Sequence, residues 1–188
     1  MKTIRIFALL LIIIFYCSST KAQTAGLLDS EFANSGIAIT NFDSEEGNAI
    51  AIQTDGKIVV AGTYSYSSGN DFMIVRYNSD GILDNTFGLN GIVTTEVGSS
   101  GNFAQALAIQ GDGKIVVAGY SSNGSNNDFA LVRYTPDGTI DSTFGSNGKI
   151  ITPIGTYHDH IIDVVIQSDG KIVACGISNS MNFRNHIM

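Results

Sequence analysis

The amino-acid sequence predicts an all-β repeat protein, and three observations support this fold class. A motif that reads Asp-Gly-Lys-Ile-Val begins at Asp55, Asp112 and Asp169, so that both steps are 57 residues. A constant step of this size is typical of repeat architectures. Each copy joins a turn-forming pair to a short apolar run, which is the pattern of a hairpin strand. After residue 22, no window keeps apolar residues at helical spacing long enough to predict a helix.

Each repeat contains four strand-like segments rich in Val, Ile, Ala, Phe or Tyr, separated by clusters of Gly, Asn, Asp and Ser. An Asp-Gly pair stands between the second and third segments. This pair is a strong hairpin signal, because Gly accepts a positive φ without steric cost. In the second repeat the expected strands are residues 91–97, 104–110, 114–120 and 128–134.

The core strand indicates how these sheets pack. Residues 58–61 are apolar at every position, whereas a strand covered on one face only would alternate. The blades of a β-propeller cover both faces of such a strand, because small antiparallel sheets pack against one another. A β-solenoid is the competing architecture, but its coils use fewer residues and lack regular tight hairpins. We therefore expect a β-propeller-like array of three four-stranded blades.

The expected organisation is a signal peptide at residues 1–22 followed by three repeats, at about 28–82, 83–139 and 140–188. The last repeat looks incomplete, because its fourth strand should begin at Asn185 and the residues there do not match the motif. Roughly four to eight blades are needed to close a propeller. An open arc and one part of an oligomer are alternatives, but we favour a fragment of a longer propeller.

The N-terminal residues have the pattern of a secretory signal. Lys2 and Arg5 precede an apolar run at 6–16, and residues 20–22 place small side chains at positions −3 and −1 of a cleavage site. A membrane anchor is the alternative, but this run is too short for a bilayer core of ~30 Å. We expect export to the periplasm, the outer cell surface or the medium, with no membrane span after cleavage.

The charge of the processed chain restricts its partners. Cleavage after Ala22 leaves seven Lys and Arg against 17 Asp and Glu, a net charge of −10. Such a surface repels phosphate backbones and anionic lipids, which argues against nucleic acid and membranes as partners. We expect a protein or glycan partner, and closure of the array needs further blades or self-association.

Three motifs recur in the same order, and the second repeat unit resembles a known family through them. They are Leu-Asp-x-x-Phe-Gly-x-x-Gly at 83–91, Gln-x-Asp-Gly-Lys-Ile-Val-Val-Ala-Gly at 110–119 and Asp-Phe-x-x-Val-Arg-Tyr-x-x-Asp-Gly at 128–138. This unit is similar to the delta-60 repeat, a β-propeller domain of unknown function in exported bacterial proteins. The resemblance covers nearly all of residues 27–180 and departs from the pattern at Ala33. It implies a propeller-like fold in a secreted or surface protein, and it supplies no catalytic residues.

The polar residues that follow the repeat have a structural interpretation. Arg76 and Arg133 lie in otherwise apolar strands, where an unpaired buried charge is very costly. We therefore expect each Arg to brace a turn or a neighbouring carboxylate. Four Asp residues recur with them: Asp71, Asp84, Asp128 and Asp141.

Two other residue types have simple interpretations. Lys57, Lys114 and Lys171 follow the hairpin turns and are expected to be solvated. Cys175 is the single cysteine left after cleavage, which excludes an intrachain disulfide. It replaces the Ala of the other copies, so we expect a buried, inert thiol.

Few residues suggest chemistry. His158 and His160 are weak metal candidates, because side chains two positions apart share one face of a strand. With too few visible ligands nearby, a solvated loop is the preferred interpretation. Residues 123–128 could hold Ca²⁺ but lack the alternating carboxylates of a dedicated calcium loop. Nucleophile elbows, phosphate-binding glycine loops and CxxC pairs are absent from the sequence, so we expect no cofactor, no metal and no enzyme activity.

The sequence therefore leads to a hypothesis of a non-catalytic exported scaffold or interaction protein. One alternative is a glycan- or ligand-binding propeller that uses tyrosines near the strand ends. Another is part of a larger propeller enzyme whose site lies in blades missing from this chain. The tyrosine candidates are Tyr64, Tyr66, Tyr120 and Tyr157.

Overall fold

The computed structural model describes residues 26–40, 44–179 and 186–187. The predicted signal peptide at 1–22 lies outside this part of the chain. The described residues form eleven strands and no helix. Accordingly, none of the described segments is a helix long and apolar enough to cross a membrane.

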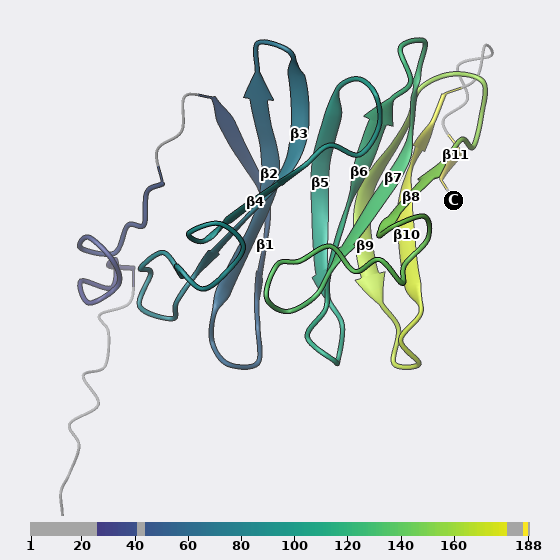
Figure 1. Cartoon of the computed structure of the whole chain (residues 1–188). Helices are drawn as coiled ribbons and strands as arrows, with labels where there is room; N and C mark the ends of the chain where they lie inside the picture. The colour runs from purple at the N-terminus through teal and green to yellow at the C-terminus, as the bar shows by residue number, and fades with distance from the viewer. Residues whose placement is uncertain (1–25, 41–43, 180–185, 188) are drawn as a thin grey trace, which may run out of the picture.

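Three antiparallel sheets contain all the described strands (Figure 1). The first has the order β1-β2-β3-β4: Glu45–Ile52, Ile58–Tyr66, Gly69–Tyr77 and Ile92–Thr95. The second has the order β5-β6-β7-β8: Asn102–Ile109, Ile115–Ser122, Asn127–Tyr134 and Lys149–Thr152. The third has the order β9-β10-β11: Asp159–Ile166, Ile172–Ser178 and His186–Ile187.

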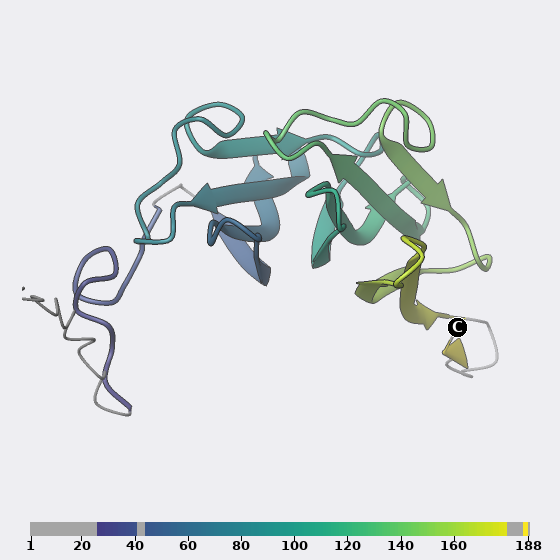
Figure 2. The same cartoon turned by 90° about the horizontal axis from the view of Figure 1, so that it is seen from below.

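The three sheets fan out side by side in an arc, with β1, β5 and β9 toward one another (Figure 2). This is an open, incomplete propeller arrangement, and it confirms the predicted all-β, blade-like fold class. The predicted hairpins are also confirmed, since Gly56, Gly113 and Gly170 all have φ of +83° or +84°.

The composition of each blade differs from the expectation of one blade per repeat. Residues 91–97 were expected to open the second blade, but β4 pairs with β3 and completes the first sheet. The reason is that the chain after β3 remains hydrogen-bonded to β3 and so stays at the edge of the first sheet. The backbone of Arg76 donates to Gly91 O and accepts from Asp84 N, both at 2.9 Å. Each outer strand is therefore supplied by the repeat that follows.

The two ends of the array follow from this offset. In the first repeat, the segment equivalent to β4 forms isolated bridges between Ile37 and residues 33–34 rather than a sheet strand. The third sheet is incomplete, as predicted, because it contains three described strands where each of the others contains four. The two-residue strand β11 pairs with β10, and Ile187 lies opposite Ile177. It begins one residue after the position that the repeat predicts.

Apolar side chains fill the space between neighbouring sheets in two layers. Residues 115–118 of β6 are all fully buried, which confirms that this strand is covered on both faces. The layer between the first and second sheets includes Val59, Phe72, Ile74, Ala104, Val117, Val132 and Tyr134. The layer between the second and third sheets includes Ala106, Val116, Ala118, Phe129, Ile161 and Val164.

Candidate functional site

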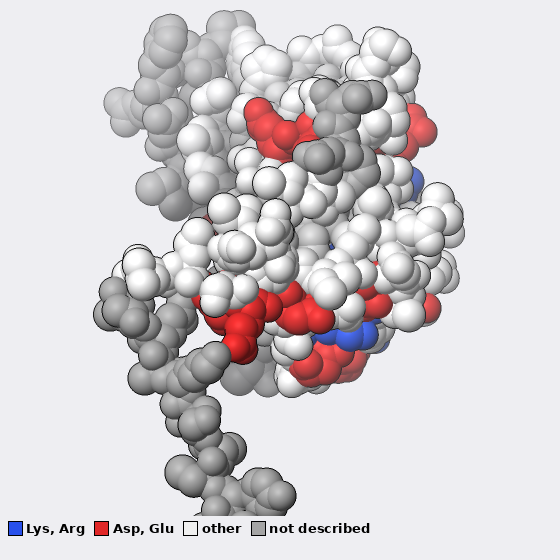
Figure 3. All heavy atoms as spheres, turned by 90° about the vertical axis from the view of Figure 1, so that its left-hand side faces the viewer, with Lys and Arg blue, Asp and Glu red and all other residues white. Residues whose placement is uncertain are grey.

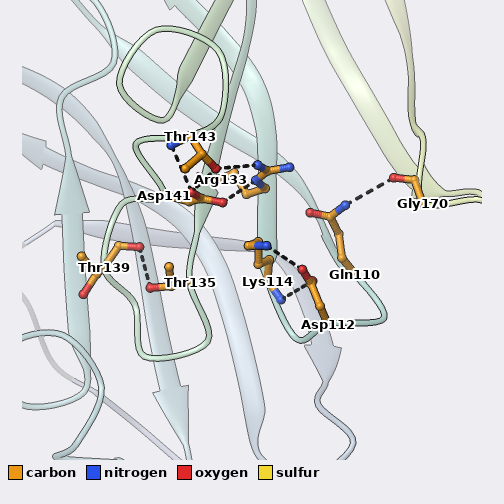
Figure 4. Close-up of polar contacts among 9 residues, drawn as sticks. All are labelled: Gln110, Asp112, Lys114, Arg133, Thr135, Thr139, Asp141, Thr143 and Gly170. Atoms are coloured by element: carbon orange, nitrogen blue, oxygen red, sulfur yellow. Dashed lines mark hydrogen bonds and ion pairs between the residues drawn. The ribbon is translucent and has the colours of Figure 1, made fainter.

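The most regular polar feature is an ion pair that recurs in the first two sheets. Arg76 Nε lies 2.8 Å from Asp84 Oδ2 in the first sheet. In the second sheet Arg133 Nε lies 2.9 Å from Asp141 Oδ2, as Figure 4 shows. Each guanidinium also stacks on the Phe of the same turn, 4.3 Å and 4.5 Å from the ring centroid. The expectation that each Arg braces a neighbouring carboxylate is confirmed.

This brace is strongest around Asp84, which is buried. Thr86 donates to its Oδ1 from the backbone N at 3.0 Å and from Oγ1 at 2.6 Å. Burial by itself raises the pKa of Asp84, but the hydrogen bonds from Thr86 and the charges of Lys57 and Arg76 lower the pKa well below its usual range. Lys57 Nζ lies 3.1 Å from Asp84 Oδ2. The prediction that Lys57 is merely solvated was therefore wrong, because it completes the pairing of a buried carboxylate.

Polar contacts at this end also join one sheet to the next. Arg76 donates to Pro136 O in the turn after β7. Gln110 donates from Nε2 to Gly170 O at 3.3 Å, which links the hairpins of the second and third sheets (Figure 4). These contacts join neighbouring sheets at this end of the array.

The histidine pair lies at the opposite end of the second and third sheets. His158 Nδ1 accepts a hydrogen bond from Asn127 N at 3.2 Å, and His160 Nε2 lies 2.8 Å from Asn127 Nδ2. Burial and the neighbouring charge of His158 lower the pKa of His160. Both rings therefore contact one asparagine of β7. Among the described residues, no group of three or more His, Cys, Asp or Glu side chains is placed to hold a metal ion.

The structure adds a polar position that the sequence reasoning missed, at the start of β5 and β9. Asn102 and Asp159 occupy this position 57 residues apart, and both are fully buried. Asn102 makes hydrogen bonds to Gly98, Ser100 and Ser121 around it. The constant step of the repeat aligns Asn102 with Asp159, but it does not show that both side chains are buried.

Two of the tyrosine candidates, Tyr64 and Tyr66, contact each other with ring centroids 4.3 Å apart, whereas Tyr120 lies in the second sheet. Tyr120 is stacked between Phe103 and His160, with ring centroids 4.9 Å and 4.0 Å away. Tyr66 lines a polar cavity of about 330 Å³ with Asn70, Asp71 and Glu96. Burial raises the pKa of Asp71 in this cavity, with a smaller contribution from the charge of Glu96.

Cys175 is exposed, and the expectation of a buried thiol was wrong. Its counterparts Ala61 and Ala118 are fully buried, because the next sheet covers them. No described residue covers the same face of the third sheet.

Acidic side chains gather along one part of the face at the first sheet, with few basic ones beside them (Figure 3). This distribution agrees with the excess of 17 Asp and Glu over ten Lys and Arg in the chain. An acidic face of this kind disfavours anionic ligands.

Fold and repeated ion pairs together define a β-propeller-like repeat protein. The sequence model of the family described as "domain of unknown function (DUF5122) beta-propeller" matches residues 53–87 and 110–144. Each matched segment runs from the hairpin of the core motif to the Phe that stacks under the Arg. No curated protein and no solved structure matches the chain. The chain carries repeats of this β-propeller family of unknown function, which is the delta-60 repeat family.

Proposed function

We propose that this protein is a non-catalytic, exported scaffold that acts through interactions between sheets. The observation that carries the proposal is the use of the repeated polar residues. Arg76 and Lys57 both pair with Asp84, and Arg133 and Asp141 repeat the Arg–Asp pair in the second sheet. Residues in register with a repeat serve the repeat, because each unit needs the same support.

An uncovered apolar face on the third sheet supports an interaction role. Val165 and Val173 lie opposite each other on β9 and β10 and are 53% and 43% exposed. Their counterparts 57 residues earlier, Ala108 and Val116, belong to the apolar layer that the third sheet covers. Because a sheet of the same repeat covers this face in the second sheet, the partner for the third is another sheet of this repeat, here from a second copy of the chain.

Export rests on the sequence of residues 1–22. The basic start, the apolar run and the small residues before Gln23 are the features that a signal peptidase recognises. The acidic charge of the processed chain fits a protein that stays dissolved outside the cytoplasm. Mass spectrometry of the secreted product should give an N-terminus at Gln23.

The interaction proposal is tested by sedimentation of the secreted chain over a range of concentrations. We expect association that increases with concentration, and loss of association in the double variant Val165→Asp, Val173→Asp, since two carboxylates prevent apolar packing. The matched control is Leu89→Asp, in the loop before β4, where the side chain is 78% exposed; this variant should leave association unchanged. A wild-type chain that stays monomeric up to about 100 μM, well above the ~1 μM dissociation constant of a modest interface, would overturn the proposal.

Binding of a glycan is a second candidate, favoured by the cavity that Tyr66 lines with Asn70, Asp71 and Glu96. An aromatic ring beside carboxylates and amides offers both a stacking surface and hydrogen-bond acceptors. A glycan array separates the two functions. Glycan binding that Tyr66→Ala abolishes, while sedimentation is unchanged, would favour this candidate over the scaffold.

A further inference from the structure

Two equivalent positions between the sheets differ in a way that predicts a ligand. Asn102 in β5 faces the first sheet, and Asp159 in β9 faces the second. They are 57 residues apart, and each pairs with an equivalent Ser, Ser121 or Ser178, in the neighbouring strand. The strand pairing at the two positions is therefore equivalent, whereas the side chains are an amide and a carboxylate.

The amide of Asn102 fills a space lined by oxygen atoms. Its Oδ1 accepts from Gly98 N at 2.9 Å and from Ser121 Oγ at 2.7 Å. Its Nδ2 lies within 3.4 Å of four oxygens: Ser100 O at 2.9 Å, Asn70 O at 3.1 Å, Asp71 Oδ1 at 3.3 Å and Gly98 O at 3.4 Å. The NH₂ group thus supplies the positive hydrogens that this oxygen-lined space requires.

Asp159 reproduces only the accepting half of this arrangement. Its Oδ2 accepts from Gly155 N at 2.9 Å and from Ile154 N at 2.8 Å, as the oxygen of Asn102 accepts from Gly98 N. Its Oδ1 therefore takes the place of the NH₂ group. This atom is buried and has no hydrogen-bond partner among the described residues.

The repeat places a second carboxylate, that of Asp128, opposite Asp159, and one of its oxygens also lacks a described hydrogen-bond partner. Asp128 is the counterpart of Asp71, which accepts the hydrogen bond from Asn102. Asp128 is 6% exposed, and its Oδ1 is likewise buried without a described partner. Its Oδ2 accepts from Asn123 Nδ2 at 3.0 Å. Between the first and second sheets, an N–H donor faces its acceptor. At the equivalent position between the second and third sheets, there are two carboxylate oxygens without a described hydrogen-bond partner.

We propose that a calcium ion binds between the second and third sheets, held by Asp128 and Asp159. The repeat places three backbone carbonyls at the same position, those of Asn127, Gly155 and Tyr157, as counterparts of Asn70, Gly98 and Ser100. Two carboxylates and three carbonyls form an all-oxygen set, and waters complete the six to eight ligands that Ca²⁺ takes. Mg²⁺ fits less well, because it requires octahedral geometry and keeps several of its waters.

The surrounding contacts hold these ligands in place. His158 and His160 both contact Asn127, which fixes the β7 strand that bears Asn127 and Asp128 against β9. Asn126 Nδ2 donates to Tyr157 O at 2.9 Å and ties the two loops together. The ion neutralises two buried carboxylates, which are otherwise costly, and joins two blades. The histidines thus support the site from outside without ligating the metal.

The proposal is tested on the full chain after chelation, by calorimetric titration and thermal unfolding. We expect one equivalent of Ca²⁺ to bind and to raise the melting temperature by about 5 °C at saturating Ca²⁺, with a smaller effect of Mg²⁺ at the same concentration. Asp159→Asn rebuilds the arrangement of Asn102, so this variant should lose Ca²⁺ binding and melt higher than the wild type without metal. The reciprocal variant Asn102→Asp should bind a second equivalent.

Two results would overturn the proposal. One is the absence of heat on titration together with no effect of Ca²⁺ on melting. The other is a metal-free chain that acidification to about pH 5 stabilises as well as Ca²⁺ does, which would show that the two carboxylates share a proton instead. Titration of the wild type decides the question even if a variant fails to fold.

Discussion

At the scale of single residues, the repeat places an Arg beside a buried Asp in each of the first two sheets, and the two charges neutralise each other. Arg76 and Asp84 form a buried pair, and Lys57 adds a second cation to the same carboxylate. The sequence could predict that the Arg is paired, because an unpaired charge in an apolar strand is too costly. The sequence could not predict that Lys57 joins the pair, because Lys57 precedes β2 and Asp84 follows β3, and only the folded sheet brings them together.

The low pKa of Asp84 makes stability depend on pH in a defined direction. Because the folded pKa lies below the unfolded value of about 3.9, the contribution of this carboxylate is complete above about pH 4 and is lost as pH falls through the folded pKa. Asp84→Asn leaves Arg76 buried without its anion, so we expect a loss of about 3 kcal/mol at pH 7. We expect urea unfolding to show a smaller difference in the free energy of unfolding between wild type and variant at pH 2.5 than at pH 7.

Asp169→Asn is the control for this experiment. Asp169 pairs with Lys171, whose side chain is 73% exposed, and solvent screens such a pair. This variant should change the unfolding midpoint little at either pH. If Asp84→Asn lowers the free energy of unfolding by the same amount at both pH values, the low pKa of Asp84 in the folded protein is contradicted.

At the scale of secondary-structure elements, the last Gly of the core motif allows two strands to approach closely. The pairing of each inner strand with its neighbour contains a bulge beside this residue, for example between Ala104 and Ala106 opposite Gly119. A Cβ on Gly119 would lie 1.9 Å from Phe103 O. Gly62 and Gly176 meet the same obstacle, with distances of 1.8 Å to Glu46 O and 2.0 Å to His160 O. The Gly is therefore required by strand packing, since none of the three has a positive φ.

We predict that Gly119→Ala destabilises the protein by about 2–3 kcal/mol, because β5 must move away from β6. Gly111→Ala is the matched control, since a Cβ at this position meets nothing within 4 Å and φ is not positive. The control should stay within about 0.5 kcal/mol of the wild type. Chemical denaturation of both variants measures the difference, and equal effects would show that the close approach is not rigid.

At the scale of the whole molecule, each sheet depends on its neighbour for cover. Val116 is fully buried between the second and third sheets, whereas its counterpart Val173 is 43% exposed. We predict that Val116→Asp prevents stable folding, because it buries an unpaired carboxylate. At concentrations at which the chain is monomeric, the free energy of unfolding of Val173→Asp should lie within about 1 kcal/mol of that of the wild type.

Circular dichroism during heating distinguishes these two variants, because they make the same change at equivalent positions. If both variants unfold alike, the outer face of the third sheet must be covered in solution, and the exposure in the structure would not describe the free chain. If neither variant has a lower melting temperature than the wild type, the apolar layer between the second and third sheets does not contribute to stability.

The sequence by itself determined the repeat, the strands and the hairpins, because these depend on neighbouring residues. Asp-Gly turns, apolar runs and a step of 57 residues are all visible without contacts, and the expected strand 128–134 differs from β7 by one residue. The predicted pairing of Arg76 also follows from local pattern and the cost of burying charge.

The tertiary structure alone decided which sheet each strand joins and which residues lie on the uncovered face of the third sheet. β4 belongs to the preceding sheet, and Cys175 is exposed, because both depend on residues far away in the chain. The same holds for the proposed calcium site. Asn102 and Asp159 differ by one atom type at equivalent positions, and only packing of β9 against the second sheet turns that difference into an oxygen-lined space without a donor.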